Sequence, residues 1–404
     1  MSTAFFLTVH AFYGPRGRAP CTGLRGGYNG TFDRGPMSDQ DLQPLAPRRL
    51  TRQIRVGQVL VGGDAPISVQ SMTKTDTRDV EATVAQIYAY ANAGCEIVRV
   101  SVPTKKAGEV FHEICDRSPI PVVADIHFDY RLALVAADGG AACLRINPGN
   151  IGGQDRVKAV VEKAGAKGIP IRIGVNGGSL EKDLLDKFGT ATPEAMVESA
   201  LRHIDVLERE GFRDIKISLK ASDVIRTVQA YRLLAQQVDY PFHLGITEAG
   251  TPFGGTIRSS IGMGILLAEG LGDTIRVSLT GEGEDECRVG HEMLRALALR
   301  SGGFRMVSCP SCGRVQIDLN RVANEIEEGL KLINHENITY AVMGCVVNGP
   351  GEAKDADLGV AGGAGEGLIY RKGELIRRVK EEDLVPAFLE EARKVKAESD
   401  AAKV

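Results

Sequence analysis

The stretch EIVRVSVPTKKAGEVFHEICDRSPIPVVADIHF, residues 96–128, decides the fold of this chain. Two β-branched segments, Glu96–Val102 and Pro121–Phe128, predict strands, and the residues between them carry the apolar period of a helix. The same alternation occurs eight times between Ile67 and Leu299. Eight consecutive βα units of about 30 residues are typical of a closed parallel barrel. We therefore predict an α/β protein with a TIM (βα)8 barrel over residues 67–300. A doubly wound open sheet is the alternative.

Strand and helix patterns of the same kind fill the rest of this region. The other predicted strands are Ile67–Gln70, Ala141–Pro148, Pro170–Asn176, Asp214–Ala221, Phe242–Thr247 and Asp273–Thr280. The clearest helical patterns are Val80–Ala93, Pro193–Glu210 and Glu284–Leu299. Before the barrel, Ile54–Val61 predicts a hairpin within a lead-in segment of residues 37–66, and we expect it to plug the bottom of the barrel.

Length and composition exclude several classes of protein. A chain of 404 residues with 43% hydrophobic and 25% charged residues is too long for a single small module and too apolar for wholesale disorder. The net charge of −3 gives no general attraction to nucleic acid or to an anionic membrane. No apolar run reaches the ~18 residues of a membrane span. We expect a soluble protein that binds neither.

Residues 1–36 differ in composition from the remainder of the chain. They hold four Arg, one acidic residue, seven Gly and six aromatic residues, without helix or strand periodicity. The segment is a poor match to a secretory signal and resembles an organelle transit peptide only weakly. We interpret it as a disordered extension or as the product of a start site placed too early.

Polar residues end five of the predicted strands in the same pattern. Residues at i and i+2 share one face of a strand, and the pairs fall at the carboxyl ends, where barrel enzymes have their active sites. These residues are Arg99 with Ser101, Asp125 with His127, Arg145 with Asn147, Ser218 with Lys220, and Arg276 with Ser278 and Thr280. Glu248 ends another strand. We predict a polar site at the mouth of the barrel.

The charges of this predicted site favour an anionic ligand. Four cations, Arg99, Arg145, Lys220 and Arg276, face the acids Asp125 and Glu248, which leaves about two positive charges. Unpaired charges in a partly buried site cost several kcal/mol each, so a purely structural network is a poor explanation. A diphosphate would neutralise the surplus. No P-loop motif is present, and we interpret the glycine-rich run Gly362–Gly367 as a loop.

Eight cysteines in so long a chain are too few for a secreted disulfide scaffold. Cys21 lies in the segment of residues 1–36 and is interpreted as incidental, and the other seven fall into two groups. Four lie in apolar patterns and are expected to be buried: Cys95, Cys115, Cys143 and Cys287. Three lie in turns rich in Gly or Pro: Cys309, Cys312 and Cys345. Turn cysteines suit metal ligation in a reducing compartment, and we therefore expect a cytoplasmic protein.

Residues 301–404 predict a separate small α+β domain around these turn cysteines. Its expected elements are a helix over Ile317–Ile333, a strand over Ile338–Met343, two short strands near 357–360 and 367–370, and a terminal helix over Glu381–Lys396. Three thiolates without an evident histidine fit a four-iron cluster better than structural zinc, which prefers four closed ligands. Glu352, across a Gly-Pro-Gly turn from Cys345, is the natural oxygen ligand.

From about residue 48 to the end, the chain resembles the bacterial IspG/GcpE family of hydroxymethylbutenyl diphosphate synthases. The motifs that carry the resemblance are Val69–Thr73, Leu144–Gly149, Gly245–Gly250, Ile275–Thr280 and Met343–Glu352. Plastid-type members have a large extra domain between the two units. Here only Arg300–Ser308 separates them, as in the two-domain bacterial form.

The resemblance implies an activity, a cofactor and partners. Members of the family reductively open 2-C-methyl-D-erythritol 2,4-cyclodiphosphate to (E)-4-hydroxy-3-methylbut-2-enyl diphosphate in the non-mevalonate (MEP) isoprenoid pathway. They take two electrons from reduced flavodoxin or ferredoxin and form homodimers. By resemblance, a [4Fe-4S] cluster is held by Cys309, Cys312, Cys345 and Glu352.

The resemblance also assigns residues in the barrel. Glu248 would be the acid/base of the barrel, and Glu352 would be a second catalytic residue. Asp125 and His127 have no settled role. The residues expected to bind the diphosphate are Arg99, Arg145, Asn147, Ser218, Lys220, Arg276 and Ser278.

Two other classes of protein remain open from the residues alone. A phosphate-binding barrel like that of aldolases or pteroate synthases, fused to a structural zinc ribbon, would show the same basic mouth. A non-enzymatic protein could use the cysteine domain to bind a protein or nucleic acid. The mixed charge of residues 301–404, without a basic stripe, argues against the latter.

Deleting residues 1–36 should leave folding and turnover unchanged, because the segment has no periodicity able to bury an apolar face. The thermal midpoint and the steady-state rate of the truncated and full chains would be compared. A marked loss of either in the truncated protein would contradict this interpretation.

Overall fold

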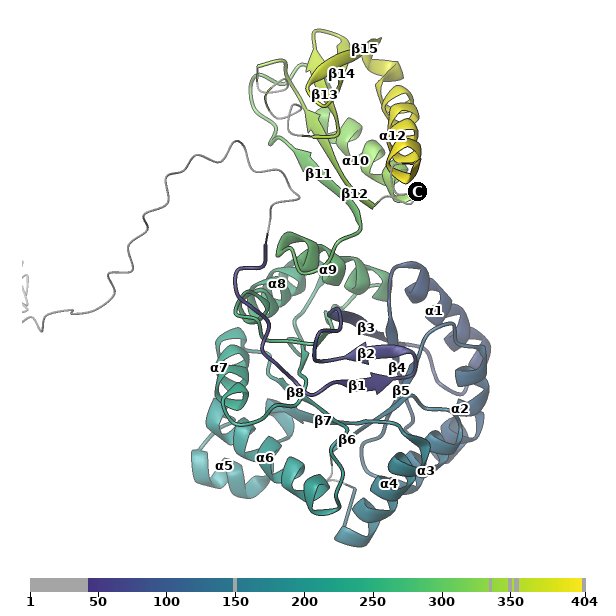
Figure 1. The fold of residues 1–404 in the computed structure, drawn as a ribbon, viewed down its shortest axis with the longest axis vertical. Helices are drawn as coiled ribbons and strands as arrows, with labels where there is room; N and C mark the ends of the chain where they lie inside the picture. Colours follow the sequence, from purple (N-terminus) through teal and green to yellow (C-terminus); the bar gives the residue numbers. More distant parts are fainter. Residues whose placement is uncertain (1–42, 148–150, 334–335, 348–350, 352–355, 402–404) are drawn as a thin grey trace, which may run out of the picture. The chain divides into compact units, whose positions relative to one another are not determined.

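A computed structural model describes residues 43–147, 151–333, 336–347, 351 and 356–401. Within these ranges two folded regions follow one another along the chain (Figure 1). The first is a parallel barrel surrounded by helices, and the second is a five-stranded sheet with two long helices. Residues 1–36 lie outside the described residues, and the boundaries placed at residues 36, 66 and 300 stay predictions.

The barrel contains the eight predicted strands. They are β3 (Ser68–Met72), β4 (Ile97–Ser101), β5 (Val122–Asp125), β6 (Cys143–Ile146), β7 (Ile171–Asn176), β8 (Ile215–Lys220), β9 (His243–Leu244) and β10 (Thr274–Ile275). They form one parallel sheet in the order β8-β7-β6-β5-β4-β3-β10-β9. A parallel bridge between Ile217 and Phe242 joins its two ends. The barrel is confirmed, and the open-sheet alternative is wrong.

The two last strands are shorter than predicted. Ladder pairing in β9 and β10 stops after two residues each, whereas the predicted strands continued to Thr247 and Thr280. Beyond these points the backbone N–H of Thr247 donates to Ala221 O, 3.2 Å away, and that of Thr280 donates to Gly250 O, 2.9 Å away. The segments after Leu244 and Ile275 therefore leave the ladder and form loops at the carboxyl end of the barrel.

Helices cover the outside of the barrel. They are α1 (Val80–Asn92), α2 (Lys105–Arg117), α3 (Tyr130–Asp138), α4 (Gln154–Lys167), α5 (Lys182–Phe188), α6 (Pro193–Arg209), α7 (Val224–Ala235), α8 (Pro252–Ala268) and α9 (Gly283–Ala296), with the short 3-10 helix η3 (Gly177–Ser179). Side-chain caps fix several starts: the Asp79 carboxylate accepts the Ala82 N–H, and the Thr104 hydroxyl accepts the Ala107 N–H. The outward-facing strand residues, such as Val98, Val100, Ile171 and Ile173, pack with these helices in one buried core.

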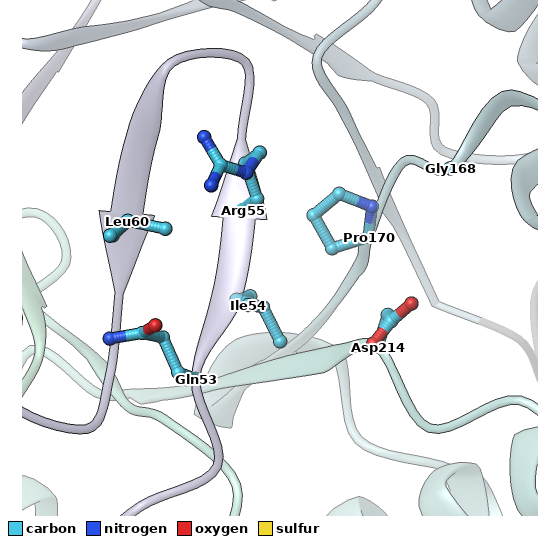
Figure 2. Close-up of a pocket in the computed structure, with 7 residues that line it drawn as sticks. All are labelled: Gln53, Ile54, Arg55, Leu60, Gly168, Pro170 and Asp214. Atoms are coloured by element: carbon cyan, nitrogen blue, oxygen red, sulfur yellow. The ribbon is translucent and has the colours of Figure 1, made fainter.

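The hairpin before the barrel closes its amino-terminal end. Strands β1 (Ile54–Val56) and β2 (Val59–Val61) pair antiparallel. Their side chains Ile54, Val56 and Val61 form a buried cluster with Ile97, Val123 and Cys143 from inside the barrel. A pocket of about 280 Å³ beside the hairpin has Arg55 and Asp214 among its lining residues (Figure 2). It lies at the end of the barrel opposite the strands' carboxyl ends.

The second region is the predicted α+β unit. It contains β11 (Gly303–Ser308), α10 (Leu319–Lys331), β12 (Glu336–Met343), β13 (Leu358–Gly363), β14 (Glu366–Arg371), β15 (Glu374–Lys380), the 3-10 helix η4 (Glu381–Asp383) and α12 (Leu384–Ala401). The strands form one sheet in chain order, parallel from β11 to β13 and antiparallel from β13 to β15. Apolar residues of α10 and α12, such as Val322, Ile326 and Phe388, pack against the sheet in its own core.

Three features of this region differ from the sequence predictions. Strands β11 and β15 were not predicted. β15 is an edge strand with nearly every residue exposed, so it has no buried face to produce a period. The run Gly362–Gly367 is not a loop. Gly363 pairs with Glu366, so only residues 364 and 365 form the turn of a hairpin. Gly367 lies within β14, where the absence of a side chain permits a close approach of Leu384.

No helix within the described ranges is both long and apolar enough to cross a membrane.

Candidate active site

The strand register brings the predicted mouth residues together. Inward-facing residues of neighbouring strands lie directly opposite one another in the ladder, because the strands are parallel and their side chains alternate. The opposed pairs are Met72 with Arg99, Asp125 with Arg145, Arg145 with Arg172, and Asn176 with Lys220. The inner face of the barrel therefore carries polar side chains on five neighbouring strands, β4 to β8, which form part of a ring.

Asp125 is the carboxylate around which three of these groups gather. It is 3% exposed, and its oxygens lie 3.2 Å from Arg145 Nη1, 3.2 Å from His127 Nε2 and 3.9 Å from Arg99 Nε. Burial alone would raise the pKa of Asp125, but Arg99, the His127 hydrogen bond and Arg145 together hold it well below its usual value. Asp125 is thus a fixed negative charge, and both it and His127 belong to the site.

Lys220 and Arg172 have no such partner. Both are buried, and within the described ranges neither forms an ion pair with a carboxylate. Burial, followed by the charges of Arg172, Arg276, Arg99 and Arg145, lowers the pKa of Lys220. The Nε and Nη1 atoms of Arg172 have no hydrogen-bond partner in this part of the chain. The site is built to receive an acceptor with negative charge.

The charges of the described mouth residues do not balance. Five cations of the site face inward, Lys216 lies beside them opposite Arg172 in the ladder, and Lys74 pairs with Glu286. Among the described residues, two carboxylates lie within ion-pair distance of any of these cations, Asp125 and Glu286, so positive charges outnumber negative ones. The five cations are Arg99, Arg145, Arg172, Lys220 and Arg276. Arg forks and a lysine ammonium at such a density are suited to phosphate oxygens.

Two glycines keep the space that these cations occupy. A methyl group added at Gly174 would lie 2.5 Å from Arg145 Nε, and one at Gly245 would lie 2.6 Å from Lys220 Nζ. The Arg145 Nη2 also donates to the carbonyl of Gly174, 3.2 Å away. At Gly174 the added methyl group would meet only the flexible end of Arg145, whereas at Gly245 it would also lie 2.7 Å from the backbone carbonyl oxygen of Arg276. Glycine is therefore required at Gly245.

The remaining predicted residues vary in their surroundings. Glu248 is exposed in the loop after β9, and its φ of 53° is in the left-handed region that few non-glycine residues adopt. Asn147 is buried, and its Oδ1 has no partner among the described residues. The Ser218 hydroxyl donates to Ile173 O at 3.3 Å, and Ser278 is half-buried. Their roles stay predictions.

Sequence reasoning missed three residues of the site, Arg172, Asn176 and Glu286. Arg172 begins the inward row of β7 that ends at Asn176, and the alternation used for the other strands could have found both. Glu286 lies on α9, where its hydroxyl donor Ser71 is 215 residues away in the chain. No local pattern relates those two positions.

The turn cysteines are brought close by the backbone of the second region. The Cys309 N–H donates to Val342 O at 3.2 Å, and the Gly344 N–H donates to Cys309 Sγ at 3.2 Å. Cys345 follows directly and is buried, whereas Cys312 is exposed. Hydrogen bonds from the Arg314 backbone and side chain lower the pKa of Cys312. The other cysteines are buried as expected, except that Cys115 is half-buried.

These thiols fit a metal site in chemistry and backbone placement, although their side chains do not converge. Among the residues that the structure describes, no three His, Cys, Asp or Glu side chains form a group able to hold a metal ion. The expected fourth ligand, Glu352, lies outside the described residues. All three thiols are free of disulfides, and no histidine stands near them in sequence.

Fold and site together define a class: a TIM-barrel enzyme with a cationic mouth for an anionic ligand, followed by a domain with metal-type cysteines. The family model of the GcpE TIM-barrel domain matches residues 51–291, and that of the GcpE protein C-terminal domain matches residues 305–394. The chain therefore belongs to the GcpE family, and it is an oxidoreductase.

Similar proteins cover nearly the whole of the described chain. A protein of Geobacter sulfurreducens is 62% identical over 348 residues, which are 86% of this chain and 98% of that protein. One of Clostridium tetani is 54% identical over 348 residues, 86% of this chain and 99% of that protein. Both are named 4-hydroxy-3-methylbut-2-en-1-yl diphosphate synthase (flavodoxin). Family membership overturns the zinc-ribbon pteroate-synthase-like and non-enzymatic alternatives.

Among solved structures, a dihydropteroate synthase of Xanthomonas albilineans matches with a TM-score of 0.45 and 13% identity, over 61% of this chain and 97% of that one.

Replacing Gly245 with Ala should destabilise the chain by about 1–3 kcal/mol, because the new methyl group would lie 2.7 Å from the backbone carbonyl oxygen of Arg276. Gly178→Ala is the matched control, since nothing lies within 4 Å of the added methyl group there. Thermal midpoints of the two variants would be compared with that of the parent chain. Equal midpoints for both variants would contradict the packing argument.

Proposed function

We propose that the barrel mouth of this chain binds 2-C-methyl-D-erythritol 2,4-cyclodiphosphate and that the cysteine domain delivers the electrons for its reduction. The reaction is the one its family carries out: the cyclic diphosphate is opened and dehydrated to (E)-4-hydroxy-3-methylbut-2-enyl diphosphate in the MEP pathway. The observation that supports this assignment best is the surplus of buried positive charge at the carboxyl end of the barrel.

The diphosphate is bound by the cations of the barrel mouth. Lys220 has no carboxylate partner among the described residues, and Arg99 and Arg145 share Asp125. Lys220 and Arg276 attract the phosphate oxygens as charges, while the guanidinium groups of Arg99 and Arg145 lie beside Asp125 and can donate in pairs. Asn147, Ser218 and Ser278 supply neutral donors from three further strand ends. Arg172 and Asn176 lie in the same ring, and we add them to the set.

Glu248 is the proposed proton donor at the mouth of the barrel. Two electrons enter the substrate, the ring C–O bond to one phosphate breaks, and a hydroxyl group leaves as water, which requires a proton donor. Glu248 follows β9 at the carboxyl end and is exposed there, so it can take up a proton from solvent and give it to the leaving oxygen. His127, hydrogen-bonded to Asp125, lies at the same end of the barrel.

The cofactor is a [4Fe-4S] cluster held by Cys309, Cys312, Cys345 and Glu352. When bound, it supplies electrons and a Lewis-acidic iron. Three features of the backbone support this assignment. Cys309 and Cys345 follow the ends of neighbouring strands. The Gly344 N–H donates to Cys309 Sγ, and the Arg314 N–H donates to Cys312. Glu352 would be a weaker ligand than the three thiolates.

Reduced flavodoxin, which the relatives' name includes, is the proposed electron donor, with ferredoxin as the other candidate. We further propose a homodimer in the cytoplasm, as in the family.

Anaerobically purified protein should be brown and contain about four irons per chain, because three thiolates and one carboxylate complete the ligand set of a four-iron cluster. Iron and zinc assays and a visible absorbance spectrum check this. Stoichiometric zinc without a visible charge-transfer band would refute the cluster.

Arg145→Ala and Lys220→Ala should each weaken binding of the cyclic diphosphate at least tenfold, or about 1.4 kcal/mol, since each removes a charge that faces the anion. Lys158→Ala, on the exposed side of α4, is the control. Dissociation constants and thermal midpoints would be measured for all three variants. Unchanged affinity combined with a large drop in midpoint would instead mean that these cations serve the fold.

A further inference from the structure

Glu286, in the first turn of α9, reaches the barrel mouth although it is not on a strand. It is 1% exposed. The Ser71 hydroxyl donates to its Oε2 at 2.9 Å, and the Leu279 N–H donates to its Oε1 at 3.0 Å. Each carboxylate oxygen therefore has one fixed donor, one from β3 and one from the segment after β10. The carboxylate has a single orientation between these two strands.

The same two oxygens face two cations of the mouth. Oε2 lies 3.9 Å from Arg276 Nε, and Oε1 lies 3.5 Å from Lys74 Nζ. Lys74 belongs to the loop after β3 and also donates to the carbonyl of Gly281. Glu286 thus connects the β3 loop, the end of β10 and the start of α9 through one charged group.

Arg276 has few other polar contacts in the described part of the chain that could fix its orientation. Its Nε is buried and has no hydrogen-bond partner in the described part of the chain. Glu286 is also the one described carboxylate within 4.0 Å of its guanidinium. Asp125, in contrast, accepts a hydrogen bond from Arg145 and lies 3.9 Å from Arg99, whose guanidinium donates to Met72 Sδ. The mouth therefore has two buried carboxylates, each of which lies beside its own cations.

The first turn of α9 has little freedom to shift Glu286. Gly283 lies against the ring of Tyr90 in α1, where any side chain at residue 283 would overlap the ring. Gly290, two turns further along the helix, contacts Val69 of β3. The helix is held at both points, so the position of the Glu286 carboxylate follows from backbone packing.

We propose that Glu286 is a positioning residue for the reaction: it sets the Arg276 guanidinium in the geometry that binds the diphosphate. The inference rests on the proposed function, because it takes Arg276 as a ligand of that group. If Glu286 were only a counter-charge to Arg276, its removal would have the opposite effect on diphosphate binding. Removing a negative charge beside an anion site strengthens anion binding, whereas removing the group that orients an arginine weakens it.

Glu286→Gln tests this difference in sign. Glutamine has nearly the same shape and retains an oxygen for the Leu279 N–H, but it loses both ion pairs. We expect the dissociation constant of the cyclic diphosphate, measured calorimetrically on anaerobic holoprotein, to rise about tenfold although the site gains a positive charge. Asp285→Asn, on the exposed side of the same turn, makes the same change in net charge and should leave the constant unchanged.

A double-mutant cycle shows whether Glu286 acts through Arg276. In an Arg276→Ala background, Glu286→Gln should have no further effect on affinity. Ser71→Ala, which removes one donor to Oε2, should weaken binding in the same direction by a smaller factor. It also serves as the test if Glu286→Gln does not fold.

Three outcomes are decisive. Unchanged or tighter binding by Glu286→Gln would overturn the inference, as would additive effects of Glu286→Gln and Arg276→Ala. If Arg276→Ala itself left the affinity unchanged, the assignment of Arg276 under the proposed function would fail first.

Discussion

The architecture depends on keeping several positive charges next to one another inside the barrel. Arg99, Arg145, Arg172, Lys220 and Arg276 repel each other in a buried environment, and each unneutralised charge costs several kcal/mol. Asp125 and Glu286 neutralise only part of this charge. The outer faces of the same strands offset the rest, because Val98, Val100, Ile171 and Ile173 are fully buried against the helices. Each strand thus has a stabilising outer face and a functional, destabilising inner face.

Residue alternation made much of this arrangement accessible from the sequence. Strand faces repeat every two residues, so the alternation alone assigns Arg99, Asp125, Arg145, Lys220 and Arg276 to one side of the sheet. Glu286 could not be assigned, because it reaches the mouth from a helix and its partner Ser71 lies on another strand far away in the chain. Strand β15 was missed for a different reason: an exposed edge strand has no apolar period to detect.

The cysteine spacing has a structural explanation that composition did not reveal. β11, α10 and β12 form a strand–helix–strand unit whose two strands are parallel, with Ser308 opposite Val342. Cys309 and Cys345 therefore come from the carboxyl ends of adjacent strands, and the spacing of 33 positions from Cys312 to Cys345 is the length of one crossover. Because β11 was not predicted, the sequence indicated three candidate ligands without showing that two of them follow adjacent strands.

The hairpin at the amino-terminal end of the barrel has a kinetic consequence. Its buried side chains close that end, so a ligand enters and leaves through the same mouth. A linear diphosphate carries more negative charge than a cyclic one, because ring opening frees an oxygen that ionises near neutral pH. Under the proposed function, the cations that bind the substrate bind the product at least as strongly. Slow release of the product, and competition between product and fresh substrate for the mouth, are then the expected consequences.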